Sequence, residues 1–131
     1  MSMRATGTFD IDSWDQQPYD DRDGVQMART RVAKTFHGEI EGTSTAELLM
    51  VGAPNGSAAY VGMERIVCRV HGRTGSFVLL HDAVRSATTQ SATWSIVPDS
   101  GTGELQGLRG AAQITIEPDG GHTFTLDYDL D

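Results

Sequence analysis

The chain has 131 residues, a single cysteine, and 18 aspartates and glutamates against 10 lysines and arginines, which give a formal net charge of −8 at pH 7. This length fits one domain over residues 1–131, and the lone Cys68 excludes an internal disulfide. The acid excess without a basic cluster argues against nucleic acid or anionic membrane as a partner. Because the N-terminus has no basic start followed by a long apolar run, we expect a cytoplasmic location.

The composition favours strands separated by turns, with 15 glycines and no long run of helix-forming residues. Alternation of apolar and polar residues, together with the bounding turn residues, predicts strands over residues 4–12, 25–37, about 43–52, 58–70, 76–85, 90–97, 111–117 and 122–130. The polar stretch QQPYDDRDG is predicted to be a loop. The glycine-rich stretch DSGTGELQGLRG is predicted to be a wide turn.

Tight connections between successive strands predict antiparallel neighbours. A single open sheet would leave two edges and one apolar face uncovered, whereas a closed sheet leaves neither. We therefore predict an all-β fold, an eight-stranded antiparallel β-barrel, with a sandwich of two sheets as the alternative. At eight strands the interior is wide enough to be filled by side chains or to hold one small ligand.

The stretch AAYVGMERIVCRV, residues 58–70, directs a carboxylate inward. Its odd positions carry Arg65 and Arg69, which favour solvent, so the even positions, Glu64 among them, are predicted to face the interior. In residues 76–85, the face with the larger aromatic residue, Phe77, also carries His81. The Glu64 face of residues 58–70 and the His81 face of residues 76–85 are thus both predicted to point inward. This brings a carboxyl group and an imidazole into the same enclosure.

The connection HGRTG sets how these two strands pair. A tight turn centred on Gly72-Arg73, with glycine in the first central position, pairs His71 with Thr74. That register places Glu64 directly across from His81, within reach of a hydrogen bond. We predict that His81 is the partner that allows Glu64 to be buried.

Parity also places Trp94 inward and close to His81. Lys34 is the only lysine, and it shares a face with apolar residues while Arg29 and Arg31 occupy the other, so it is a candidate interior charge. The facing of residues 43–52 stays open between the set Ala46, Leu48 and Met50 and the set Thr45, Glu47 and Leu49.

Two interpretations of the interior polar groups follow. In the first, Glu64 and His81 act as a general acid and base near neutral pH, because burial raises the pKa of the carboxyl while a neighbouring protonated imidazole lowers it. In the second, Glu64, His81 and Lys34 form a satisfied polar cluster that fixes strand register. The candidate ligand contacts are Tyr60, Trp94, Phe77, Lys34, Phe124 and Tyr128, with core filling as the alternative for the rings of Tyr60, Trp94 and Tyr128.

Metal binding is not expected, because the histidines and Cys68 are scattered without a short ligand spacing. Cys68 itself shares a face with Ile66 and Val70 and is interpreted as a small buried hydrophobe. No cofactor is expected.

The stretches FHGEIEGTSTAELL, YVGMERIVCRVHGRTGSFVLLHD, VPDSGTGELQGLRG and HTFTLDYDL follow one another in this order. With them the chain, from Arg4 to Leu130, resembles a bacterial family of small proteins of unknown function that has the allene oxide cyclase-like barrel. The resemblance implies an eight-stranded antiparallel barrel with a cavity. Relatives of that barrel include allene oxide cyclases, dirigent-like proteins and spirotetronate cyclases, which enclose an apolar molecule and direct its ring closure mainly by positioning. None of their catalytic motifs maps onto this sequence.

Three functions are compatible with these features. The first is a cofactor-independent cyclase or isomerase that holds a hydrophobic small molecule, with Glu64 and His81 as the acid-base pair. The second is a protein that binds such a molecule without transforming it. The third is a filled barrel that works through surface association, for which the outward residues Val61, Met63 and Val67 could support a homo-oligomer.

Overall fold

The structure is a computed structural model that describes residues 2–130. Almost the whole chain is extended, and no helix occurs within those residues. The strands are β1 (Met3–Arg22), β2 (Val25–Gly38), β3 (Ile40–Gly52), β4 (Ala58–Val70), β5 (Arg73–Arg85), β6 (Gln90–Ile96), β7 (Thr102–Gly103), β8 (Arg109–Ile116) and β9 (His122–Asp129).

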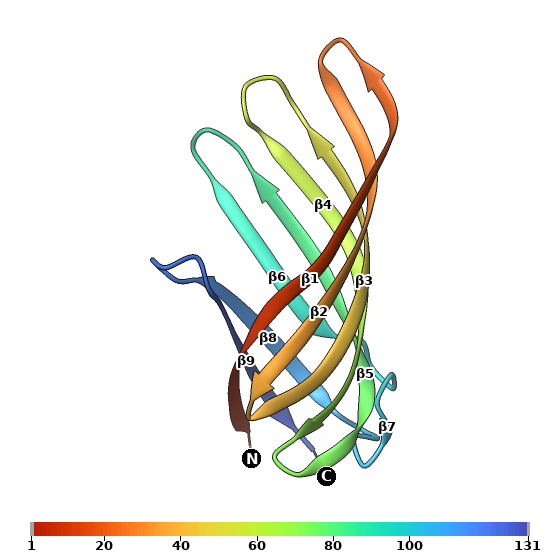
Figure 1. The fold of residues 1–131 in the computed structure, drawn as a ribbon, viewed down its shortest axis with the longest axis vertical. Helices are drawn as coiled ribbons and strands as arrows, with labels where there is room; N and C mark the ends of the chain where they lie inside the picture. The colour runs from red at the N-terminus through yellow and green to blue at the C-terminus, as the bar shows by residue number, and fades with distance from the viewer. Residues whose placement is uncertain (1, 131) are drawn as a thin grey trace.

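The eight long strands form one closed antiparallel barrel, which confirms the predicted fold class. Their order around the ring is β1, β2, β3, β4, β5, β6, β8 and β9, with β9 paired again to β1. The two-residue β7 pairs only with β5 at the lower end of the barrel, where both termini also lie (Figure 1). Closure leaves each strand with one face inside, which explains the alternation of buried and exposed residues along β4 and β9.

The predicted loop QQPYDDRDG is mostly strand, so that part of the prediction is wrong. β1 continues through it to Arg22, and only Asp23 and Gly24 form the turn, both with positive φ. Two irregularities in the β1–β2 ladder, next to Ile11 and next to Pro18, accommodate this long polar strand. In the β1–β2 hairpin, residues 10–22 of β1 are exposed on both faces apart from the half-buried Asp20, which is why that part of the sequence lacks the alternation that marks a strand.

The β4–β5 register differs from the predicted one by two residues. The turn consists of His71 and Gly72, with φ of 48° and 81°, because a hairpin turn with two positive φ values matches the strand twist. Val70 therefore pairs with Arg73, and His81 lies opposite Gly62 rather than Glu64. A shift of two residues keeps every side chain on its predicted face, so Glu64 and His81 become diagonal neighbours on the inner wall.

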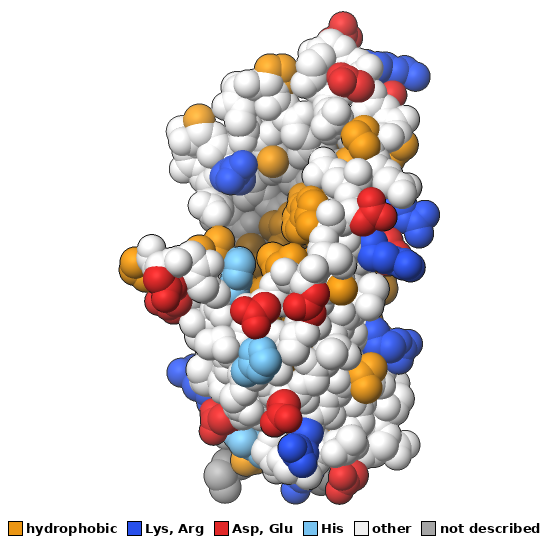
Figure 2. Space-filling model, viewed as in Figure 1, with side chains coloured by type: hydrophobic (Ala, Val, Ile, Leu, Met, Phe, Trp, Pro, Cys, Tyr) orange, Lys and Arg blue, Asp and Glu red, His pale blue; other side chains and the backbone are white. Residues whose placement is uncertain are grey.

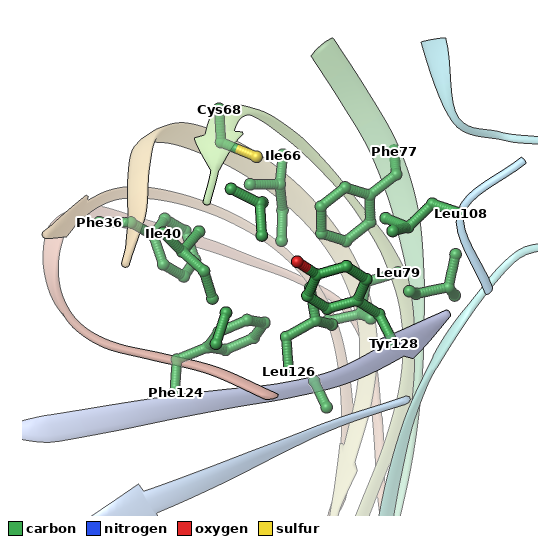
Figure 3. Packing of buried hydrophobic residues seen from close by; sticks show 14 of the residues in the cluster. Phe36, Ile40, Ile66, Cys68, Phe77, Leu79, Leu108, Phe124, Leu126 and Tyr128 are labelled. Carbon is green, nitrogen blue, oxygen red and sulfur yellow. The ribbon is translucent and has the colours of Figure 1, made fainter. Parts of the chain in front are cut away.

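The lower half of the barrel is a solid apolar core. Figure 3 shows its rings and aliphatic side chains pointing toward one another from β2, β3, β4, β5 and β9. The predicted wide turn DSGTGELQGLRG contains β7 and carries Leu105 and Leu108, which are both fully buried. These two leucines close the lower end of the barrel.

The upper half is open. The β6–β8 ladder has only two residue pairs, and the β1–β9 ladder ends where Phe9 meets His122. Above these points the β1–β2, β3–β4 and β5–β6 hairpins extend together, while the β8–β9 hairpin points away from them (Figure 1). Figure 2 shows a hollow between them in which hydrophobic side chains are visible.

The outer wall carries the apolar residues noted in the sequence. Val61, Met63 and Val67 are about half exposed, at 49%, 57% and 54% of their surface. Within the described chain, the structure contains no helix that is long and apolar enough to cross a membrane.

Candidate functional site

Four consecutive strands each contribute one polar side chain to a band across the inner wall. Lys34 comes from β2, Ser44 from β3, Glu64 from β4 and His81 from β5, and all four are buried. The strands position them by parity, because each side chain lies on the inward face of its strand between apolar residues.

Glu64 is the centre of this band. Its Oε1 atom accepts a hydrogen bond from His81 Nε2 at 2.7 Å and lies 3.2 Å from the Lys34 ammonium, while Ser44 Oγ donates to Oε2 at 2.5 Å. The side chain has no exposed surface. The predicted contact between Glu64 and His81 is therefore present, although through a different register.

The electrostatic balance keeps this carboxyl ionised. Burial raises the pKa of Glu64, but the hydrogen bond from His81, the charge of Lys34 and the hydrogen bond from Ser44 together outweigh it. The net result is a pKa below the ordinary value of 4.5. Glu64 is therefore a permanent acceptor near neutral pH, not the acid with a raised pKa that burial alone would produce.

An ionised Glu64 fixes the proton on His81. Because the carboxylate can only accept, the proton of a neutral imidazole lies on Nε2, and Nδ1 carries the lone pair. Nδ1 has no hydrogen-bond partner among the described residues. One carboxylate already balances one ammonium here, so the band is electrically neutral when His81 is neutral.

A second unpartnered polar atom lies beside the first. The indole Nε1 of Trp94 also lacks a hydrogen-bond partner in the part of the chain described. Trp94 pairs directly with His81 across β5 and β6, and their rings meet edge to face at 6.4 Å. The Tyr60 ring lies 6.2 Å from that of His81. Burial raises the pKa of the Tyr60 hydroxyl, and a hydrogen-bond interaction with the Trp94 N–H opposes this effect, so the N–H is directed toward Tyr60 although the contact lies outside ordinary hydrogen-bond geometry.

The polar band forms the floor of a cavity in the open half of the barrel. The cavity has a volume of about 430 Å³, within the range of about 300 to 1,000 Å³ common for small-molecule sites. Lys34 and His81 reach its surface, whereas Glu64 stays behind them. The Lys34 ammonium also lies 4.5 Å from the centre of the Phe9 ring, which forms part of the same wall.

The structure separates the predicted ligand contacts into two groups. Tyr60, Trp94 and Lys34 line the cavity. Phe77, Phe124 and Tyr128 lie instead in the solid core of the lower half, exposed by 2% of their surface or less. The Tyr128 hydroxyl is bound to His71 Nδ1 at 2.5 Å near the closed end. These three rings fill the core, because the inward faces of β5 and β9 run below the cavity floor; of the three, only Tyr128 had core filling as its alternative interpretation.

Sequence reasoning missed Ser44 and most of the cavity mouth. Ser44 belongs to the set of residues 43–52 that includes Ala46, Leu48 and Met50, which the structure shows to be the inward one. The signal in the sequence was the even position of Ser44, which it shares with those three residues. In the structure Ser44 pairs with Lys34 in the β2–β3 ladder. The mouth is lined by residues that sequence alone does not bring together, among them Trp14, Arg85, Ile116 and His122.

Cys68 and the metal-binding side chains play no visible part in this site. Burial raises the pKa of the Cys68 thiol to about 12, which removes its nucleophilic form near neutral pH. No group of three or more metal-binding side chains occurs within residues 2–130.

Comparison with known proteins assigns the chain to a family. Residues 5–128 match the family described as "Protein of unknown function (DUF3224)". The chain belongs to the DUF3224 family. A crystal structure of a DUF3224 protein of unknown function from Shewanella oneidensis MR-1 is similar to it, with 35% sequence identity, coverage of 100% of this chain and 99% of that chain, and a TM-score of 0.86. No curated protein matches this DUF3224 chain.

Proposed function

We propose that this DUF3224 protein is a cofactor-independent isomerase or cyclase that binds an apolar small molecule in the barrel. The observation that carries the proposal is the unpartnered Nδ1 atom of His81, held beside a large apolar cavity by a fully paired carboxylate. An imidazole fixed in this way is a typical general base. The resemblance to allene oxide cyclase-like barrels, whose relatives close rings on apolar molecules, points in the same direction.

The chemistry needs only the groups of the polar band. His81 Nδ1 takes a proton from a carbon or oxygen atom of the ligand, and the electrons of the broken bond move into the ligand. The Lys34 ammonium at the cavity surface stabilises the negative charge that develops there. Return of the proton to a different carbon completes an isomerisation without any change of oxidation state. Glu64 and Ser44 act by positioning, because they hold His81 and Lys34 and do not reach the cavity surface.

A ligand must displace an aromatic ring to reach the base. His81 Nδ1 and Trp94 Nε1 are shielded from solvent, and the rings of Tyr60 and Trp94 lie against His81. Trp94 is partly exposed toward the cavity, so its side chain has room to turn. Exclusion of water from this position favours proton transfer to the ligand over loss to solvent.

The base is tested with a probe that requires no knowledge of the natural ligand. 5-Nitrobenzisoxazole is a small apolar molecule that opens to a coloured phenolate when a base removes its C–H proton and the N–O bond breaks. We expect the protein to accelerate this reaction and His81→Gln to return it to the uncatalysed rate. Glu64→Gln should lower the rate less, because His81 remains as the base although the tautomer and orientation of its ring are no longer fixed.

His122→Gln is the matched control, since His122 also lines the cavity but its ring stacks on Phe9 and is not hydrogen-bonded to Glu64. Equal rates in wild type and His81→Gln would remove the proposed base. A protein that binds the probe without accelerating its opening would favour the second function, a carrier of a hydrophobic molecule. That alternative rests on the cavity alone.

A further inference from the structure

The charges around the cavity are distributed unlike those of the whole chain. Aspartate and glutamate outnumber lysine and arginine 18 to 10 in the sequence. Nevertheless, no acidic residue of the described chain lines the cavity, whereas Lys34, Arg85, His81 and His122 do. The carboxylate behind the cavity wall, Glu64, is fully covered and balanced by Lys34. The cavity is therefore a concave region that favours negative charge on an otherwise acidic protein.

Arg85 is the one permanent cation at the mouth among residues 2–130 that has no acidic partner there. It lies at the end of β5, pairs with Gln90 across the hairpin to β6, and is exposed. The side chains beside it at the mouth, Gln90 and Ser91, are neutral hydrogen-bonding groups. One guanidinium with neutral polar neighbours matches a singly charged planar group, a carboxylate, better than a doubly charged phosphate.

Small residues connect this cation to the proposed base. Arg85 and His81 lie on the same inward face of β5, four residues or about 13 Å apart at a rise of about 3.3 Å per residue. Between them lies Ala83, which pairs with Ala92 on β6 and with Tyr60 on β4, while Ala58 on β4 pairs with Arg85; all three alanines line the cavity. This row of alanines is too apolar to bind a polar chain, and its small side chains leave room for a hydrocarbon chain.

We propose that the ligand is an amphipathic carboxylate whose head group pairs with Arg85 and whose apolar body follows the three alanines toward His81 and Trp94. The inference rests on the proposed function of the cavity as a ligand site and adds the chemical class of the ligand. Arg85 is a binding residue in this arrangement, and the unpartnered N–H of Trp94 is a donor for an oxygen atom farther along the molecule.

Intrinsic fluorescence can test this class of ligand, since both tryptophans of the chain, Trp14 and Trp94, line the cavity. The probes are decanoate, 1-decanol and decylamine, titrated at pH 7 into the full-length protein. We expect decanoate to bind more tightly than either of the others. Arg85→Gln should weaken decanoate binding by about tenfold or more, since one charge-assisted pair is lost, and should leave 1-decanol binding unchanged.

Arg65→Gln is the matched control, because Arg65 is exposed on the outer face of the neighbouring β4 and its loss changes net charge by the same amount. It should bind decanoate as wild type does. The proposal is overturned if Arg85→Gln binds decanoate like wild type, if 1-decanol binds as tightly as decanoate, or if no probe changes the fluorescence.

The failure of this inference can be told apart from failure of the proposed function. 5-Nitrobenzisoxazole is uncharged, so its His81-dependent opening does not require Arg85. If that reaction persists while decanoate shows no preference, the base stands and the ligand class is wrong. If decanoate binds through Arg85 but no reaction depends on His81, the ligand class stands and the catalytic role is wrong.

Discussion

At the scale of single residues, Glu64 determines the character of the barrel interior. Three donors from three other strands converge on its two oxygen atoms. A carboxylate buried in this way is stable only while its partners remain, and the partners depend on it equally. Lys34 in particular is 7% exposed and has no other acidic partner within residues 2–130.

Replacement of Glu64 by glutamine should lower the free energy of unfolding by about 3–5 kcal/mol, because it leaves the buried Lys34 ammonium without a counter-charge. Urea denaturation at pH 7 measures the loss. The double variant Glu64→Gln with Lys34→Met should recover part of it, since both charges are then absent. The control is Glu47→Gln, which removes a carboxylate paired with Arg29 and Arg31 on the outer wall and should change stability little. An equal effect of Glu64→Gln and Glu47→Gln would contradict the buried ion pair.

The lowered pKa of Glu64 predicts an acid-sensitive contribution to stability. In the unfolded chain this carboxyl titrates near 4.5, and in the folded protein below that value. Between the two pKa values the unfolded state binds more protons, so stability falls as the pH decreases through this window and the contribution is complete above it. Denaturation curves from pH 7 to pH 3 should show a steeper decrease for wild type than for Glu64→Gln. Parallel decreases would mean that the pKa of Glu64 is not lowered.

At the scale of elements, the faces of β4 and β5 could be predicted from sequence, whereas their register could not. The faces follow from where Arg65, Arg69 and Phe77 lie, and a strand period of two transmits that information along the whole strand. The register depends on which residues adopt positive φ in the turn, a choice between Gly72-Arg73 and His71-Gly72 that the sequence leaves nearly balanced. The contact between Glu64 and His81 forms despite the two-residue shift in register, because both side chains point into the barrel and are diagonal neighbours there.

The close approach of β3 makes Gly62 on β4 a position where no side chain fits. It lies opposite His81, and a Cβ atom there would be 2.3 Å from the carbonyl oxygen of Glu47 on β3. Gly62→Ala should therefore destabilise the fold by about 1–3 kcal/mol through backbone displacement between β3 and β4. Gly52→Ala, at the end of β3 with nothing near its Cβ, should be nearly neutral. Thermal denaturation of both variants tests the close approach of β4 to β3, and a tolerated Gly62→Ala would argue against it.

The length of β1 could not be predicted, because the part of the strand after Phe9 is exposed to solvent on both faces. Residues 16–22 contain proline, aspartate and glutamine, which are typical of a loop, and no apolar alternation is needed where no core exists to bury it. Pairing with β2 overrides the local preference. The same extension brings Trp14 to the cavity mouth, a contact that depends on tertiary structure alone.

At the scale of the whole molecule, the barrel combines a solid lower half with a hollow upper half. The lower half depends on Leu105 and Leu108, which a glycine-rich connection places across the end of the barrel. The sequence indicates the turn but not its contribution to the core. Its two leucines resemble ordinary loop residues, and only the folded barrel shows that they pack into the core. The cavity likewise follows from which of the inward side chains are small, a property of the closed barrel and not of any one strand.

Leu105→Ala should lower the free energy of unfolding by about 2–5 kcal/mol, as expected for a fully buried leucine. Ile116→Ala, at a residue of the cavity mouth that is 70% exposed, should have little effect. Chemical denaturation compares the two. A small effect of Leu105→Ala would mean that the connection does not seal the barrel.

The short β6–β8 ladder gives the molecule a seam. Around the ring this seam lies across from the continuous β2–β3 ladder, so an extensively paired wall stands opposite the weakest pair of long strands. Separation of β6 from β8 breaks only two residue pairs and leaves Lys34, Ser44 and Glu64 in place. Separation at this seam would therefore open a lateral path into the cavity for a ligand too bulky for the mouth, and the charged residues that receive the ligand would stay in place.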